Sequence, residues 1–261
     1  DNMSLIASSI MSKKLASGAD AIVLDVKTGS GAFMKSEKDS FALAKEMVTL
    51  GNMAGRKTIA VVSDMDQPLG RAVGNALEVE EAIATLRGEG PEDFTKLCMT
   101  LGTYMLIAGG VSSDEKDAEK RLQRVIEDGS ALKKLAEFVQ AQGGDAKAVY
   151  DTTFLPKASV IEEIVSVQSG YNEKIDCDEI GICSLILGGG RETKESEIDL
   201  SVGLILNKKV GDHVASGEPL AVIYANDRAK LTAAKERFLK AYHFADKPVQ
   251  RAQLIKGIVR E

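Results

Sequence analysis

A strand–helix–strand pattern in the first quarter of the chain decides the fold. Residues 21–26, AIVLDV, form a short and nearly continuous apolar run, which is typical of a parallel strand buried on both faces. Residues 28–31, TGSG, interrupt the run, and residues 36–51 then show helical spacing behind a serine that can serve as the N-cap. A second apolar run follows at 58–62. This order predicts a parallel sheet within an α/β layer.

The segments on either side extend this prediction. Residues 4–16 have amphipathic spacing and predict a helix that stops near a glycine. From about 74 to 142 the apolar side chains recur at helical intervals, with breaks rich in glycine or charge. After about residue 150 strands and turns predominate, and we expect a small β-rich domain near 165–226. We expect strands at 159–168, 180–187, 202–206 and 219–224. A helix at 228–241 and a basic tail follow them.

Composition excludes several classes of protein. The chain has 261 residues and a formal charge of -6, which argues against a nucleic-acid partner because such proteins usually carry a basic stripe. No apolar run approaches the roughly 20 residues that cross a bilayer, so we expect no membrane partner. The three cysteines indicate reduced thiols and a cytoplasmic protein. The two histidines are far apart in sequence, which argues against a histidine-based zinc site.

The first helix carries the most informative polar pattern. Ser9 and Lys13 are four residues apart, so their side chains project from one face, and Ile6 and Ile10 border them. An apolar surface with one hydroxyl and one ammonium suits a flat polar ring, whose edge the polar groups would meet while the isoleucines cover its face. The alternative is an ordinary amphipathic helix with Lys13 in water.

Two loops follow the predicted parallel strands. Ligands in open α/β sheets gather beyond the carboxyl ends of the strands, so residues 25–33 are expected to line a site, although the third glycine of a dinucleotide motif is absent. Residues 63–72 precede a helix with Glu78, Glu80 and Glu81, and carboxylates near free carbonyls can bind a hard cation. A solvated loop and helix face is the alternative.

Several motifs in the same order resemble one family. Residues 8–14 (SSIMSKK) are similar to the signature helix of thymidine and pyrimidine-nucleoside phosphorylases, and residues 21–33 (AIVLDVKTGSGAF) to the strand and loop that follow it. Residues 68–78 (PLGRAVGNALE) and 187–191 (LGGGR) also match. The resemblance runs from residue 1 to about 245.

The resemblance implies a pentosyltransferase of nucleoside salvage. The family cleaves pyrimidine nucleosides (thymidine, uridine or deoxyuridine) with inorganic phosphate to a free base and a (2-deoxy)ribose 1-phosphate. Ser9 and Lys13 match residues that hydrogen-bond the base, and Ile6, Ile10 and Phe33 match apolar positions around it. The backbone carbonyls of Leu69 and Ala72 and the carboxylate of Glu81 match ligands of a bound cation, usually assigned as potassium.

The resemblance also implies that the chain is the C-terminal part of a longer enzyme, which acts as a homodimer. We expect the N-terminal helical domain and the loop that binds most of the phosphate to be missing. Residues 1–18 would then be a remnant helix of that domain, 19–160 the α/β domain, and 161–261 a C-terminal α+β domain with a hammerhead-like fold. That fold resembles biotinyl and lipoyl carriers, but Lys208 and Lys209 lack the sequence context of a carrier lysine.

Two rival interpretations stay open at this point. The chain could be a folded module that is inactive without its missing half. It could also be a related phosphoribosyltransferase, although the combination of the base-contact helix and the hammerhead-like domain favours the nucleoside phosphorylases.

Overall fold

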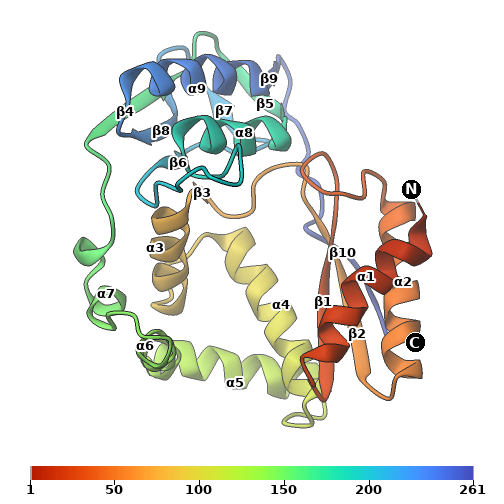
Figure 1. Ribbon diagram of the computed structural model, residues 1–261. Coiled ribbons are helices and arrows are strands. Elements are labelled where there is room, and N and C mark those ends of the chain that lie inside the picture. The colour runs from red at the N-terminus through yellow and green to blue at the C-terminus, as the bar shows by residue number, and fades with distance from the viewer. Residues whose placement is uncertain (1, 261) are drawn as a thin grey trace. The chain divides into compact units, whose positions relative to one another are not determined.

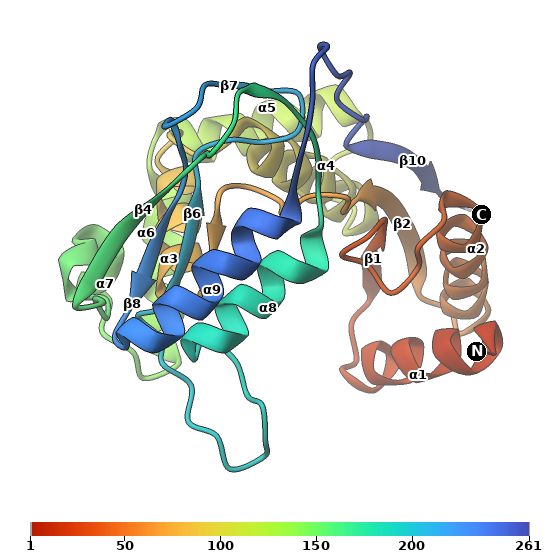
Figure 2. The ribbon, with the colours of Figure 1, turned by 90° about the horizontal axis from the view of Figure 1, so that it is seen from above.

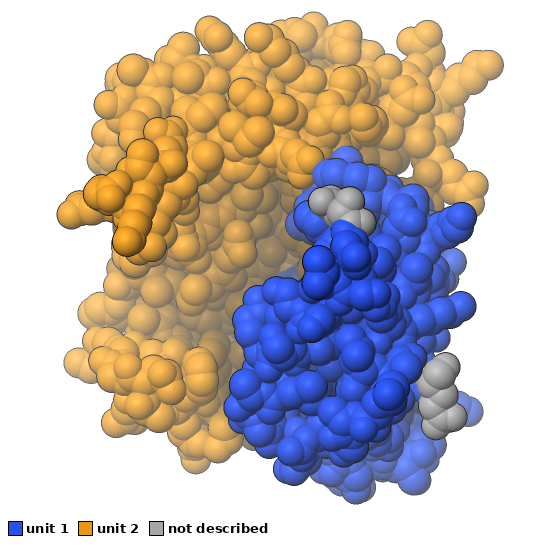
Figure 3. Space-filling view, turned by 45° about the vertical axis from the view of Figure 1, so that its right-hand side comes forward, with its two compact units in different colours: residues 1–65, 93–125, 252–261 blue, residues 66–92, 126–251 orange. Residues whose placement is uncertain are grey.

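The computed structural model describes residues 2–260, so the first and last residues of the expected terminal domains lie outside the described residues (Figure 1). The chain divides into two compact units. Unit 1 contains residues 1–65, 93–125 and 252–261, and unit 2 contains residues 66–92 and 126–251 (Figure 3).

Unit 1 is built on a three-stranded sheet in the order β1-β2-β10. Strands β1 (Ala21–Thr28) and β2 (Lys57–Asp64) are parallel and pair without a shift along their whole length, which confirms the predicted parallel arrangement. Strand β10 (Ile255–Val259) pairs antiparallel with the other side of β2. The basic segment expected after the last helix thus contains a strand that was not predicted from the sequence, and Ile255, Ile258 and Val259 of this strand pack into the cores of the unit.

Helices cover both faces of this sheet. Helices α1 (Met3–Ala16) and α2 (Glu37–Met53) lie on one face, where they share a core with alternate residues of β1 (Figure 2). The serine expected to cap α2, Ser36, accepts a hydrogen bond from the amide of Asp39 over 3.2 Å. Helix α4 (Glu92–Ala108) supplies Tyr104 and Leu101 to the opposite face, against the outward-alternating residues of both parallel strands.

Unit 2 has a four-stranded sheet, β3-β6-β8-β4, and a three-stranded sheet, β7-β5-β9. The side-by-side helices α8 (Cys177–Leu187) and α9 (Arg228–Ala241) pack on a shared core with the larger sheet (Figure 2). The strands are β3 (Ala72–Val73), β4 (Val160–Val165), β5 (Gly170–Ile175), β6 (Gly203–Leu206), β7 (His213–Val214), β8 (Pro219–Ala225) and β9 (Tyr242–Ala245).

The helical stretch predicted between 74 and 142 is confirmed. It comprises α3 (Asn75–Leu86), α4, α5 (Glu115–Glu127) and α6 (Ser130–Ala141). The short helices α7 (Lys147–Tyr150) and η1 (Thr152–Phe154) follow. Within unit 2, Ile83, Ala136 and Val149 form a small buried cluster that joins α3, α6 and α7.

One predicted strand is a helix. Residues 180–187 were expected as a strand because they are almost continuously apolar, but they belong to α8. Ile180, Cys183 and Leu187 are buried at helical spacing, and the left-handed Gly188 ends the helix. Burial raises the pKa of the Cys183 thiol to about 12, so it stays protonated and donates to the carbonyl of Ala234 on α9.

The two compact units divide the chain differently from the expected domains. The boundaries expected at 18/19 and 160/161 do not coincide with the unit boundaries. Residues 66–92 fall in unit 2 because β3 pairs with β6 from the C-terminal half, through Ala72 and Ile205. The expected domains were drawn from the family resemblance, whereas the units reflect contacts within the structure, so the expected division stays a prediction. None of the helices within residues 2–260 is both long and apolar enough to cross a membrane.

The core of unit 2 gives a direct test of this packing. Phe238 on α9 is 0% exposed and lies at a tilt against the ring of Tyr242, with ring centres 4.7 Å apart. We expect Phe238→Ala to lower the free energy of unfolding by about 3–5 kcal/mol, because it removes apolar contacts and leaves a cavity. Urea unfolding followed by circular dichroism measures this change.

The matched control is Phe138→Ala on α6, where the ring is 60% exposed. Its unfolding midpoint should stay close to that of the parent chain. Equal losses in the two variants would contradict the assignment of Phe238 to the core.

Candidate functional site

Helix α1 presents two different faces in unit 1. Ala7 and Met11 are buried and pack with α2 into the unit core, which fixes the rotation of the helix about its axis. Asn2 caps the first turn by accepting from the amide of Leu5 over 3.3 Å. Lys13 and Lys14 lie in the last turn, where positive charge is favourable.

This rotation places Ser9 and Lys13 in solvent. Among residues 2–260 the Lys13 ammonium and the Ser9 hydroxyl pair with no other side chain, so both are available to a ligand. Ile6 and Ile10 are half-buried and pack partly against the core of unit 1. Only part of each isoleucine is thus left for the apolar cover that we expected.

Lys13 and Phe33 lie at different ends of strand β1. Lys13 lines an open pocket of about 310 Å³ together with residues 21–23, where β1 begins. Phe33 follows the carboxyl end of the strand and is 69% exposed. The structure therefore does not bring these two predicted contacts into one pocket.

The glycine-rich loop after β1 is closed by its own hydrogen bonds. The amides of Gly29 and Ala32 donate to carbonyls within the loop, and that of Gly31 donates to the carbonyl of Met65 over 2.9 Å. These N–H groups are consequently not available to an anion. The loop presents Phe33 to solvent, and its role in lining a site stays a prediction.

Sequence reasoning missed a polar network at the carboxyl ends of β1 and β2. The Lys27 ammonium lies 2.7 Å from Asp25 Oδ2 and 3.0 Å from Ser63 Oγ, and Ser63 donates to Asp25 Oδ1 over 2.5 Å. Two polar residues at alternate positions of an apolar strand share one face, which is the signal that could have found them. The three groups satisfy one another, so the network supports the loop that follows. Burial raises the pKa of the nearby Cys98 thiol, although the charge of Lys27 opposes the shift.

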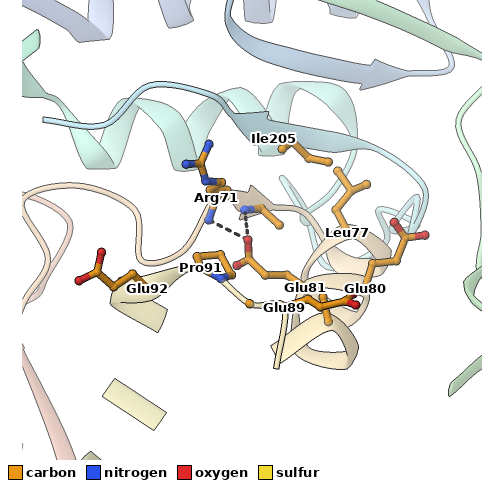
Figure 4. A pocket seen from close by; sticks show the side chains of 11 residues that line it. Arg71, Leu77, Glu80, Glu81, Glu89, Pro91, Glu92 and Ile205 are labelled. Atoms are coloured by element: carbon orange, nitrogen blue, oxygen red, sulfur yellow. Dashed lines mark hydrogen bonds between the residues drawn. The ribbon is translucent and has the colours of Figure 1, made fainter. Parts of the chain in front are cut away.

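In unit 2 the carboxylate of Glu81 meets the turn that contains Leu69 and Ala72. Glu81 projects from α3 back to the turn before β3, and its Oε1 accepts from the amides of Arg71 over 2.8 Å and Ala72 over 3.0 Å (Figure 4). Leu69 and Ala72, whose carbonyls were the other predicted ligands, flank that point in the turn. A carboxylate that accepts two backbone N–H bonds holds this turn firmly against the helix.

Gly70 makes the close approach of Glu81 possible. Its φ of +67° lies in the left-handed region, and a Cβ at this position would overlap the Glu81 carboxylate. The turn therefore depends on glycine for two independent reasons, backbone conformation and space.

A pocket of about 540 Å³ lies beside this turn (Figure 4). Carboxylates predominate among its charged side chains, so the local field favours cations. The charged lining residues are Arg71, Glu80, Glu81, Glu89 and Glu92. Within residues 2–260 no three His, Cys, Asp or Glu side chains are grouped as metal ligands, so a cation here would depend on backbone carbonyls as well.

Lys208 and Lys209, which lie between β6 and β7, are engaged within the protein. Lys208 lies 2.5 Å from Glu218 Oε1 and donates to the carbonyl of His213, and Lys209 donates to the carbonyl of Gly70 over 2.6 Å. A carrier lysine has to be presented freely at a hairpin tip, so neither side chain is placed for that role.

Comparison with known proteins found two family models that match separate parts of the chain. Residues 3–132 match the model of the glycosyl transferase family a/b domain, and residues 171–245 match that of the pyrimidine nucleoside phosphorylase C-terminal domain. Both matches agree with an α/β domain followed by a smaller C-terminal domain.

The chain is also similar in sequence to curated proteins. The chain is 52% identical over 255 residues to a pyrimidine-nucleoside phosphorylase of Geobacillus stearothermophilus. The aligned region covers 98% of this chain and 59% of that protein. It is 54% identical to the enzymes of that name from Bacillus subtilis and Staphylococcus haemolyticus, over 87% of this chain and 52% of each relative. The chain thus spans between half and three-fifths of their length.

The double requirement for glycine at position 70 can be tested by substitution. We expect Gly70→Ala to lower the free energy of unfolding by about 2–4 kcal/mol, because it adds left-handed strain of about 1–2 kcal/mol and displaces a carboxylate from two charge-assisted hydrogen bonds. Chemical denaturation reports the total.

Gly217→Ala in the same unit separates the two effects, since Gly217 has φ +85° and open space around its Cβ position. The loss in free energy of unfolding in that control should reflect the backbone strain alone. A loss no larger in Gly70→Ala than in Gly217→Ala would mean that Glu81 does not restrain the turn.

Proposed function

Because the chain is a homologue of pyrimidine-nucleoside phosphorylases over 98% of its length, we propose that it takes part in the phosphorolysis of pyrimidine nucleosides. The reaction yields a free base and a (2-deoxy)ribose 1-phosphate, which makes the protein a pentosyltransferase. The observation that carries the proposal is the solvent face of α1, where Ser9 and Lys13 stand unpaired within the family's signature helix.

The chemistry of this face suits the departing base. When the glycosidic bond breaks, the pentose takes on positive charge and the pyrimidine ring takes on negative charge. The Lys13 ammonium and the Ser9 hydroxyl can donate to oxygen or nitrogen atoms at the ring edge and so stabilise that charge. The exposed parts of Ile6 and Ile10 lie on the same helix, and Phe33 would have to approach from the loop after β1 when the nucleoside binds.

The proposal also covers the co-substrate, the nucleosides and the working form of the protein. Inorganic phosphate is the co-substrate, and we place most of its site in sequence outside the chain, which spans 59% of the Geobacillus relative. We further propose thymidine, uridine and deoxyuridine as substrates, and a cytoplasmic homodimer as the working form.

Release of free base tests the proposal. The protein is expressed from its gene, its intact mass is determined, and it is incubated with phosphate and either uridine or thymidine. Phosphate-dependent formation of uracil or thymine supports the proposal. If a protein whose intact mass exceeds the 27.9 kDa of this chain releases no base, the proposed activity is wrong.

The role of Lys13 predicts a large kinetic effect. We expect Lys13→Ala in the active protein to lower kcat/KM for uridine and thymidine by about 10²–10³, because it removes a donor to the leaving base. Steady-state assays of phosphorolysis measure the change. Lys45→Ala serves as the control, since this exposed lysine on α2 has no partner within residues 2–260. A kcat/KM near that of the parent protein in Lys13→Ala would remove this lysine from the site.

We also propose that the turn before β3 binds a monovalent cation, potassium. The donor set would be the carbonyls of Leu69 and Ala72 and the carboxylate of Glu81, all oxygen ligands of the kind that hard cations prefer. The fit is supported by the two hydrogen bonds that draw Glu81 onto the turn and by the glycine that leaves room for it. Such a cation would stabilise the turn electrostatically.

Potassium should therefore stabilise the protein through Glu81. We expect KCl to raise the melting temperature of the parent protein above that in choline chloride of equal ionic strength, since a ligand at 100 times its Kd adds about 2.7 kcal/mol. Glu81→Ala should lose most of this increment. Glu89→Ala, which removes another carboxylate of the pocket, should keep it. An undiminished potassium effect in Glu81→Ala would refute the site.

A further inference from the structure

The turn that carries the proposed cation ligands is also held by an ammonium group. Lys209, on the connection between β6 and β7, donates to the carbonyl of Gly70 over 2.6 Å and to the carbonyl of Pro68. These two residues lie on either side of Leu69. The contact joins the region that matches the C-terminal domain of the family to the region that matches its a/b domain, inside unit 2.

The backbone that presents this ammonium is itself fixed. The carbonyl of Lys208 accepts from the buried hydroxyl of Tyr242 over 3.0 Å, and the amide of Lys209 donates to Asp212 Oδ2 over 2.8 Å. The amide of Val210 donates to the side chain of Gln67 over 3.0 Å, next to the turn. Lys209 therefore reaches the turn from a stem with little freedom of its own.

These contacts restrain the peptide group whose carbonyl belongs to Leu69. Each peptide unit is planar, so the backbone turns only about the φ and ψ angles between units. Lys209 holds the units that contain the carbonyls of Pro68 and Gly70, and Glu81 holds the amides of Arg71 and Ala72. The intervening unit, with the carbonyl of Leu69, is thus restrained on both sides.

We infer that Lys209 is a positioning residue for the cation site, because it sets the turn in the conformation that directs backbone carbonyls to a monovalent cation. The inference rests on the proposed potassium site. It assigns to the C-terminal domain a direct part in cation binding, through a residue that is not a ligand. Because a restrained turn loses less conformational entropy when a cation binds, loss of the restraint should weaken cation binding.

The test compares two adjacent lysines. Lys209→Met removes the ammonium and keeps most of the apolar stem, and Lys208→Met removes a neighbouring ammonium that contacts Glu218 and His213 and does not contact the turn. Melting temperature is measured against KCl concentration, with choline chloride keeping the ionic strength constant. We expect the potassium concentration that gives half of the maximal rise in melting temperature to increase about tenfold or more in Lys209→Met. In Lys208→Met it should change less than twofold.

A second readout does not depend on potassium. Amide hydrogen exchange of Arg71 and Ala72 in choline chloride should become at least about tenfold faster in Lys209→Met and stay unchanged in Lys208→Met. If Lys209→Met does not fold, Lys209→Arg provides the same comparison with the charge retained, and we expect a smaller rise in the potassium concentration because a planar guanidinium fits two converging carbonyls less well.

The outcomes separate the inference from the proposals beneath it. A potassium response that is equal in Lys209→Met and the parent protein, or one that strengthens because a competing positive charge has gone, overturns the role of Lys209 and leaves the cation site standing. A parent protein without any potassium response overturns both. Phosphorolysis by the same preparations decides the nucleoside activity independently.

Discussion

The burial of strand β2 from Thr58 onward is the constraint on which unit 1 depends. Every residue from Thr58 to Asp64 is buried, so the strand needs hydrogen-bond partners on both edges and apolar cover on both faces. Parallel β1 and antiparallel β10 supply the partners, and helices α1, α2 and α4 supply the cover. Because α1 must direct Ala7 and Met11 inward to meet this demand, Ser9 and Lys13 are left on the solvent side.

In unit 2 a comparable constraint acts on a turn. The segment before β3 is held by Glu81 from α3, by Lys209 from the β6–β7 connection and by pairing with β6. Each contact comes from a different stretch of the chain, and together they restrain successive peptide groups. A turn fixed in this way can offer its carbonyls to a cation without being ordered at the moment of binding, which is the general advantage of preorganisation.

The strand–helix–strand pattern and the long helical region could be predicted because their periodicities are local properties of the sequence. The prediction failed for residues 180–187, where an almost continuous apolar run fits a buried strand and a buried helix equally well. It also failed for β10, since a short edge strand is defined by the partner it meets, here residues 60–63 of β2. Neither error could be removed by closer study of the local segment.

The sequence by itself determined the family resemblance, the α/β class and the identity of the side chains on the face of α1, because these follow from residue order and from spacing along one element. Only the tertiary structure decided that Lys209 meets Gly70 at the turn that Glu81 holds, since this contact joins residues 139 positions apart in the chain. It also decided that Lys13 and Phe33 lie at opposite ends of β1. Spacing along a chain fixes which residues share a face, whereas packing fixes which faces meet.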